Sequence, residues 1–173
     1  MNSEDITQAL ANYCLRERNA ALCTANIFAY YPNECDVLAI WDSGFATDYE
    51  IKVSRSDFKA DFKKAKHRKM ERNQVAGANQ FYFVVPADLV TKEEVPDYAG
   101  LIYVSEGRQG ILHLTTIKRA PKRHKQKVSE KVVRRMARSI CFKFFSDNTP
   151  AANGWKRKYG DLLHEVGKIN GEH

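Results

Sequence analysis

The sequence lacks the residue patterns that mark several common kinds of site. Its four cysteines, Cys14, Cys23, Cys35 and Cys141, show neither C-x-x-C spacing nor the mixed cysteine and histidine spacing of a zinc site. There is no glycine-rich Walker loop, and the five histidines are not paired at zinc-ligand spacing. P-loop ATP hydrolysis and zinc chemistry are therefore disfavoured. Unpaired cysteines in apolar segments indicate a reducing cytoplasm.

Long apolar runs are also missing. No window approaches the roughly 18 apolar residues that a membrane helix requires. Residues 1–5 contain no basic stretch leading into an apolar one, which is the pattern of a signal peptide. We therefore expect a cytoplasmic protein with neither a signal peptide nor a membrane span, and with no membrane partner.

Length and charge limit the remaining choices. A chain of 173 residues with 43% hydrophobic content is long enough for one domain with a core, and too short for two comfortable ones. Its formal net charge of +7 suggests a polyanionic partner. Residues 1–58 hold nine acids and four bases, whereas residues 118–143 hold eleven Lys or Arg and the single acid Glu130. The acidic and the phosphate-binding parts are thus expected to be separate.

Two predicted strands, 34–40 and 47–53, flank a polar turn at residues 42–44. In the second strand Tyr49, Ile51 and Val53 alternate with Glu50 and Lys52, so the apolar side chains share one face and the ionic pair the other. Ionised side chains on a central strand are costly to bury unless they pair or bind a metal. This stretch is the strongest candidate for a functional site.

Asp36, on the neighbouring strand, can supply a second carboxylate beside Glu50. Two carboxylates and a backbone carbonyl such as that of Ile51 form a hard oxygen site for Mg²⁺ or Mn²⁺, which can neutralise a phosphate and lower the pKa of bound water. Lys52 could orient that water or stabilise the developing negative charge. We therefore predict Asp36, Glu50 and Lys52 as catalytic residues. The alternative is a surface hairpin with an ordinary Glu50/Lys52 pair.

At these residues the sequence resembles the PD-(D/E)XK nuclease superfamily. Asp36 matches the aspartate of its motif and Glu50-Ile51-Lys52 matches its (D/E)XK tripeptide, although Cys35 rather than proline precedes Asp36. The continuation at 53–58 is similar to MmcB-type DNA repair nucleases and related phage proteins. The resemblance runs from about residue 5 to 117. It implies an α/β fold with a restriction-endonuclease-like α/β/α core and a central mixed sheet, and DNA cleavage in repair or recombination.

A helix is predicted over residues 3–18, capped by Ser3, with Glu17 at the edge of its apolar stripe. Resembling nucleases often bring an extra acid from this helix to the metal, which makes Glu17 a candidate ligand. The alternative for Glu17 is an exposed charge at the helix end. A second helix is predicted from Ser54, because Ser54 and Asp57 have capping-box spacing, and it continues into the basic run at 63–72. That run is either a solvated helix face or a flap that grips a nucleic-acid strand.

Further strands are predicted at 22–30, 80–85, 101–104 and 111–117. The continuous apolar run at 80–85 is typical of a strand covered on both faces. Gln80, which begins it, could face the metal site or simply be a polar residue at a strand end. A helix, three strands, a helix and more strands fit an α/β core over residues 1–120.

Residues 121–173 are predicted to form a basic helical extension packed on or appended to the core, with a helix at 129–145 whose packing face includes Val132, Met136 and Phe144. Its basic side chains are expected to contact phosphates, although a solvated helix face is the common alternative. Ser54 could contribute a hydroxyl at a helix start, besides capping. The candidate nucleic-acid-binding residues are Ser54, Lys122, Arg123, Lys125, Arg134, Arg135 and Arg138.

Together these patterns predict a Mg²⁺- or Mn²⁺-dependent nuclease acting on nucleic acid, with DNA favoured by the resemblance. The alternative from another class is a non-catalytic nucleic-acid-binding module that keeps the nuclease fold. A third alternative is an interaction protein that uses the C-terminal amphipathic segment. The sequence does not separate DNA from RNA, because both display phosphates. It also leaves open whether two copies pair as a homodimer for double-strand cleavage.

Overall fold

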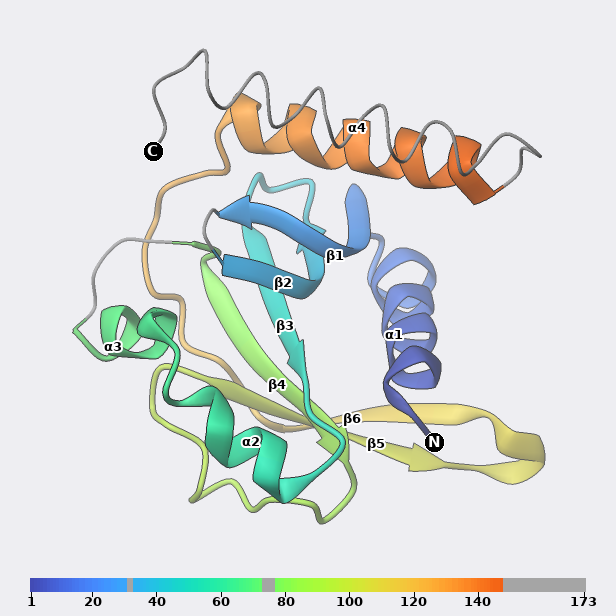
Figure 1. Ribbon diagram of the computed structural model, residues 1–173, viewed down its shortest axis with the longest axis vertical. Coiled ribbons are helices and arrows are strands. Elements are labelled where there is room, and N and C mark those ends of the chain that lie inside the picture. Colours follow the sequence, from blue (N-terminus) through green and yellow to red (C-terminus); the bar gives the residue numbers. More distant parts are fainter. Residues whose placement is uncertain (31–32, 73–76, 148–173) are drawn as a thin grey trace. The chain divides into compact units, whose positions relative to one another are not determined.

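The computed structural model describes residues 1–30, 33–72 and 77–147 (Figure 1). Its elements follow in the order α1 (Ser3–Asn12), the π-helical segment η1 (Tyr13–Glu17), β1 (Leu22–Tyr30), β2 (Asn33–Ile40), β3 (Ala46–Ile51), α2 (Arg55–Asp61), α3 (Ala65–Glu71), β4 (Gln80–Pro86), β5 (Gly100–Glu106), the 3₁₀ turn η2 (Arg108–Gly110), β6 (Leu112–Lys118) and α4 (Glu130–Asp147). Every predicted strand is present. The chain is therefore an α/β protein, as predicted.

The six strands form one mixed sheet in sequence order, β1-β2-β3-β4-β5-β6. β3 pairs in parallel with β4, and β4 with β5, while the other neighbours are antiparallel. A parallel neighbour requires a crossover, and α2 and α3 occupy the crossover between β3 and β4. The central strand β3 therefore lies between β2 and β4, and the helical crossover follows its carboxyl end.

Apolar side chains pack on both faces of this sheet. Tyr49 and Ile51 of β3 belong to the cluster that includes Ile6 and Leu10 of α1. On the opposite face, a second cluster contains Phe58 of α2 and Met70 of α3, packed against β4 and β5. Because side chains alternate along a strand, Glu50 points away from α1, toward α2 and α3. The predicted placement of Glu50 opposite the apolar residues of its strand is confirmed.

The first helix begins at Ser3, as predicted, but its α-helical part is shorter and its cap is a different residue. Asn2, not Ser3, is the N-cap: its side chain accepts from the Asp5 amide and the Asp5 carboxylate accepts from the Asn2 amide. Regular α-helix ends at Asn12, and η1 carries the chain to Glu17. The predicted start at residue 3 is thus confirmed, whereas the predicted cap at Ser3 was wrong and the α-helix ends at Asn12, where a π-helical segment follows it.

The β2–β3 hairpin depends on Gly44. This residue has a φ of +78°, which side chains disfavour, and its amide donates to the Trp41 carbonyl at 2.8 Å. A Cβ at this position would lie 3.1 Å from Lys127 Cδ. The glycine thus permits both the turn and the close approach of the basic segment that follows β6.

The chain divides into two compact units, Met1–Met136 and Ala137–His173. The first unit includes residues 121–136, because Val132 and Met136 at the start of α4 join a buried cluster with Leu38 and Ile40. The boundary predicted at residue 120 thus falls inside the first unit. In the second unit α4 continues to Asp147, where Phe144, predicted to pack, is 62% exposed. Predictions for residues 148–173 lie outside the described residues.

None of the helices among the described residues has the length and apolar character needed to cross a membrane.

Candidate active site

Glu50 lies near the end of β3 and is among the most deeply buried charged residues of the described chain, with 1% of its surface exposed. Lys52 follows immediately after the strand, which ends at Ile51 rather than at Val53 as predicted. The Lys52 amide still continues the ladder, donating to the Val84 carbonyl at 3.0 Å. Lys52 is itself 5% exposed. The ionic pair is therefore a buried feature of the sheet, which argues against an ordinary surface hairpin.

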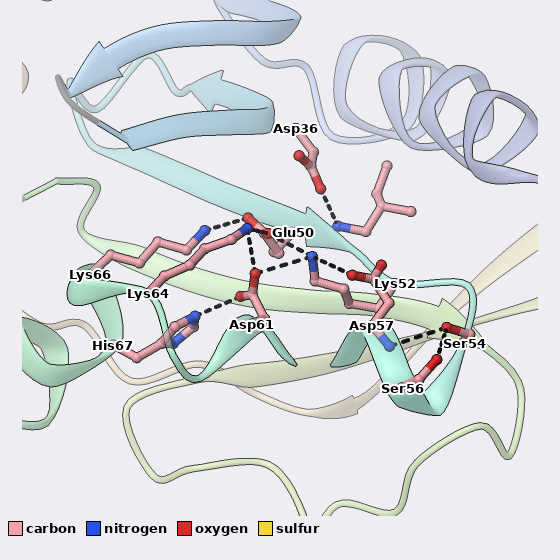
Figure 2. A network of polar contacts seen from close by, with 11 residues as sticks. Asp36, Glu50, Lys52, Ser54, Ser56, Asp57, Asp61, Lys64, Lys66 and His67 are labelled. Atoms are coloured by element: carbon pink, nitrogen blue, oxygen red, sulfur yellow. Dashed lines mark hydrogen bonds and ion pairs between the residues drawn. The ribbon is translucent and has the colours of Figure 1, made fainter. Parts of the chain in front are cut away.

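Three lysine ammoniums converge on the Glu50 carboxylate (Figure 2). Lys52 Nζ lies 2.8 Å and Lys64 Nζ 3.0 Å from Glu50 Oε1, and Lys66 Nζ contacts Oε2. Lys66 is 7% exposed and its ammonium also lies over the ring of Phe81, whereas the side chain of Lys64 is 53% exposed. One carboxylate thus holds two nearly buried cations and one exposed cation.

Asp61, at the end of α2, is a second buried carboxylate in this cluster. Its Oδ1 lies 3.1 Å from Lys52 Nζ and 2.5 Å from Lys64 Nζ, and its Oδ2 lies 2.6 Å from His67 Nε2. The other ring nitrogen of His67 is 2.8 Å from the hydroxyl of Tyr98. Three ammoniums therefore face these two buried carboxylates and the exposed carboxylate of Asp57, whose Oδ1 is 3.7 Å from Lys52 Nζ.

The electrostatics of Lys52 and Asp61 follow from these contacts. Burial by itself would lower the pKa of Lys52, but the charge and hydrogen bond of Glu50 raise it above its ordinary value, with help from Asp61. Burial would raise the pKa of Asp61, yet its bonds to His67 and Lys64 hold it well below its usual range. Both side chains are therefore fixed in their charged forms at neutral pH.

A break in the helical crossover brings these groups together. Ser54 caps α2, as predicted, by accepting from the Asp57 amide at 3.2 Å. The helix does not continue through the basic run; it ends at Asp61, and α3 begins at Ala65. Phe62 in the break packs edge-on against Phe58 of the same crossover. This turn directs Lys64 and Lys66 back toward β3, so the basic run is only partly a solvated helix face.

Asp36 lies beside the ion pairs without joining them (Figure 2). Its Oδ2 accepts a hydrogen bond from the Ile51 amide at 2.8 Å, which ties β2 to the end of β3. Burial and the negative charge of Glu50 raise the pKa of Asp36 above its ordinary value. The two carboxylates are thus close enough to repel each other, and a cation between them would relieve that repulsion.

These residues fit a divalent cation in part. Asp36 and Glu50 are hard oxygen donors of the kind Mg²⁺ prefers, and Mg²⁺ often binds through one or two carboxylates with water completing its shell. The described residues contain no group of three His, Cys, Asp or Glu side chains arranged to hold a metal ion. Asp36, Glu50 and the Ile51 carbonyl would therefore hold the cation, which would compete with lysines for Glu50.

Asp48 is a further acid that sequence reasoning did not single out. It precedes Glu50 by two residues on β3, so it points to the same face. Its Oδ1 is buried and has no hydrogen-bond partner among the described residues. Burial raises the pKa of Asp48 to about 7, and the charge of Glu50 adds to the effect. The alternation on β3 was the signal that could have identified it.

The structure does not bring Glu17 or Gln80 to Glu50. Glu17 is exposed at the end of η1, and Cys14 of the same segment packs with Tyr49 on the other face of the sheet. The proposed extra metal ligand is therefore corrected to the alternative, an exposed helix-end charge. Gln80 donates through Nε2 to the Ala120 carbonyl at 2.9 Å, which gives it a role in holding the segment after β6.

The predicted nucleic-acid-binding residues fall into two groups, those that contact other parts of the protein and those that are exposed. Several make contacts within the protein: Arg123 donates to the Ala78 carbonyl, Arg135 to the carbonyls of Phe28 and Ala29, and the Lys122 ammonium lies over the Phe45 ring. Arg134 pairs with Glu130 on the exposed side of α4. Lys125 and Arg138 are exposed, the latter in the second unit. Exposed bases at 122–134 are thus the better candidates for phosphate contacts in the first unit.

The basic segment at 122–128 is attached to the start of β3. The Asn79 side chain accepts from the Ala46 amide at 2.8 Å and donates to the carbonyls of His124 and Gln126 at 3.0 and 2.8 Å. At about 3.3 Å per strand residue, Ala46 lies about 13 Å along β3 from Glu50. A nucleic acid bound at Glu50 could therefore reach this segment within a few nucleotides.

Comparison with known proteins gives a fold and no family. No family model matches the chain, and no curated protein matches it. Among solved structures, a protein of unknown function from Silicibacter pomeroyi is similar, with a TM-score of 0.65 and 17% sequence identity over 88% of this chain and 94% of that one. At that identity the similarity shows a shared fold alone. This chain therefore adopts an α/β fold that also occurs in the Silicibacter pomeroyi protein.

Proposed function

We propose that this protein is a metal-dependent nuclease with a restriction-endonuclease-like core, and that its substrate is DNA undergoing repair or recombination. The observation that carries the proposal is the buried Glu50–Lys52 pair at the end of a central strand, with Asp36 on the next strand. Buried ionic groups of this kind are costly for a structural role alone and cluster at functional sites. Their order along the chain is that of the PD-(D/E)XK motif.

Hydrolysis requires a water oxygen to bond to phosphorus while one phosphorus–oxygen ester bond breaks. The water loses a proton and the leaving oxygen gains one. Asp36 and Glu50 would hold Mg²⁺ or Mn²⁺, which when bound lowers the pKa of water and neutralises phosphate charge. The Lys52 ammonium stands beside Glu50, where it can orient the attacking water and stabilise charge on the phosphate oxygens.

A second candidate is a nucleic-acid-binding module without turnover. It is favoured by the lysines that already pair with both oxygens of Glu50 and by the exposed bases between residues 122 and 134, such as Lys125. Exposed bases bind phosphates without a metal. A cleavage assay on linear, gapped, flapped, branched and RNA substrates, each with Mg²⁺, Mn²⁺ or a chelator, separates the two candidates. Metal-dependent cleavage of any substrate supports the nuclease, whereas tight binding with no cleavage supports the module.

Divalent cations should stabilise the folded protein. A ligand that binds only the folded form at roughly ten times its Kd adds about 1.4 kcal/mol. For a chain of this size that corresponds to a rise in Tm of about 3–6 °C. We expect this rise with Mn²⁺, and we expect Asp36→Asn to remove it, because the variant loses a ligand charge. Differential scanning fluorimetry measures both; equal shifts in parent and variant would place the cation elsewhere.

Lys125 should contribute a phosphate contact. Changing Lys125 to Gln is expected to weaken DNA binding on all sequences alike, and to flatten the slope of log K against log salt by about 0.9. The control is Lys92→Gln, which removes another exposed charge, beside Glu93 in the connection between β4 and β5. Fluorescence anisotropy across a salt series gives both slopes. Identical slopes for the two variants would show that the basic segment does not contact phosphates.

A further inference from the structure

Lys52 has three carboxylates within 4 Å, and they differ in burial. Glu50 Oε1 lies at 2.8 Å, Asp61 Oδ1 at 3.1 Å and Asp57 Oδ1 at 3.7 Å from its ammonium. The side chains of Glu50 and Asp61 are 1% and 0% exposed, whereas that of Asp57 is 52% exposed. Solvent screens the interaction with Asp57. Two carboxylates therefore fix the position of Lys52.

The Glu50 carboxylate cannot pair with the Lys52 ammonium and bind a divalent cation equally well. A cation on the Glu50 carboxylate would repel the ammoniums that now contact the same two oxygens, because like charges a few ångströms apart in a buried site are weakly screened. Asp61 faces no such conflict, because it lies on α2 and has its own contacts. When Glu50 binds the cation, Asp61 is the buried carboxylate that still holds Lys52.

Asp61 is itself held in place. Its Oδ2 is 2.6 Å from His67 Nε2, and His67 Nδ1 is 2.8 Å from the Tyr98 hydroxyl (Figure 2 shows the His67 contact). The imidazole of His67 is 1% exposed and stacks on the Phe83 ring at 5.9 Å with an interplanar angle of 10°. Partners that fix a functional group in this way set its geometry. The Asp61 side chain is thus held by His67, and the His67 ring is held by Phe83 and Tyr98.

We propose that Asp61 is a positioning residue for the nuclease reaction, fixing the Lys52 ammonium while Glu50 binds the cation, and that His67 and Tyr98 fix Asp61. The inference rests on the proposed function and extends it beyond the PD-(D/E)XK motif. It makes the α2–α3 crossover part of the catalytic centre. A purely structural ion pair would support folding but would have no specific effect on turnover.

The test is Asp61→Asn, which keeps the shape of the side chain and removes its charge. We expect kcat to fall about 10-fold to 100-fold, as is typical when a residue that orients a catalytic group is lost. KM for DNA and the affinity for Mn²⁺, measured by titration calorimetry, should change less than about threefold, because Asp61 contacts neither ligand in this account. The matched control Asp57→Asn, which removes the exposed carboxylate near Lys52, should keep kcat within about threefold.

Three results would overturn the inference. They are unchanged kcat in folded Asp61→Asn, an equal loss in the Asp57→Asn control, and a loss that appears in KM or Mn²⁺ affinity instead of kcat. If Asp61→Asn does not fold, Tyr98→Phe replaces it as the test, since this change removes only the Tyr98 hydroxyl that hydrogen-bonds His67. Tyr98→Phe should lower kcat by about threefold to tenfold with normal melting; an unchanged kcat overturns the inference. A parent protein that never cleaves refutes the proposed function instead, and this inference with it.

Discussion

Glu50→Gln is expected to lower the free energy of unfolding by about 3–5 kcal/mol, the cost typical of removing one partner from a buried ion pair. The loss arises because Lys52 and Lys66, at 5% and 7% exposure, would keep their charges while the carboxylate between them disappears. Asp61 could compensate for Lys52 but does not contact Lys66. Urea denaturation monitored by circular dichroism measures the change.

The control for this prediction is Glu34→Gln, which removes an exposed carboxylate from β2 and should alter stability by less than about 0.5 kcal/mol.

A second variant separates the effect of charge on stability from the effect of side-chain shape. Adding Lys66→Met to Glu50→Gln should restore part of the lost stability, because an apolar side chain beside Phe81 needs no counter-ion. Equal stability of Glu50→Gln and parent would show that the cluster is hydrated and not a buried ionic site.

Lys52→Ala is expected to slow cleavage by about 10²-fold to 10⁴-fold at saturating DNA and Mn²⁺, the range associated with loss of a group that transfers protons or stabilises charge. Affinity for DNA should change little, because the exposed basic side chains supply most of it. Single-turnover cleavage with a labelled duplex gives the rate, and anisotropy gives the affinity.

Lys63→Ala is the matched control for Lys52, because Lys63 is exposed in the same crossover. It should cut at nearly the parent rate. Lys52→Ala must show parent-like circular dichroism before its rate is interpreted, since removing a buried ammonium also leaves Glu50 with fewer partners. Cleavage by the folded variant within a few-fold of the parent rate would exclude Lys52 from the chemistry.

The strands could be predicted because their signals are local. Alternation in 47–53 placed Glu50 opposite Tyr49 and Ile51, and β3 shows that arrangement. The continuous apolar run at 80–85 indicated a strand covered on both faces, and β4 has the central place between two parallel neighbours. The cap at Ser54 was equally local. Periodicity and capping depend on residues a few positions apart, so the sequence is sufficient for them.

The rest of the site depends on contacts that periodicity does not describe. Asp61, Lys64 and His67 lie in a stretch that the sequence presents as a continuous helix with a basic end, and only the break after Asp61 turns Lys64 toward Glu50 and His67 toward Asp61. Glu17 failed as a ligand for a similar reason. Its helical position was predicted, but the face of the sheet on which that helix packs is set by tertiary contacts such as those of Cys14.

The basic residues show the same limit. Composition identified a cationic segment, and several of its members are exposed. Composition could not show that Arg123 and Arg135 use their guanidinium groups to hold backbone carbonyls. These two residues hold the basic segment and residues 130–136 within the first unit, so their loss would affect folding as well as any phosphate contact.

The measurement that tests the central claim most directly is plasmid nicking by the parent protein and by Asp36→Asn, each with Mn²⁺ and with a chelator. Asparagine can still accept the hydrogen bond from the Ile51 amide, so the variant should keep its fold and its DNA affinity while losing the metal-ligand charge. We predict nicking by the parent protein in Mn²⁺. We expect none above background by the parent in chelator, or by Asp36→Asn in either condition. Nicking by folded Asp36→Asn at the parent rate, or nicking that persists in the chelator, would contradict the account.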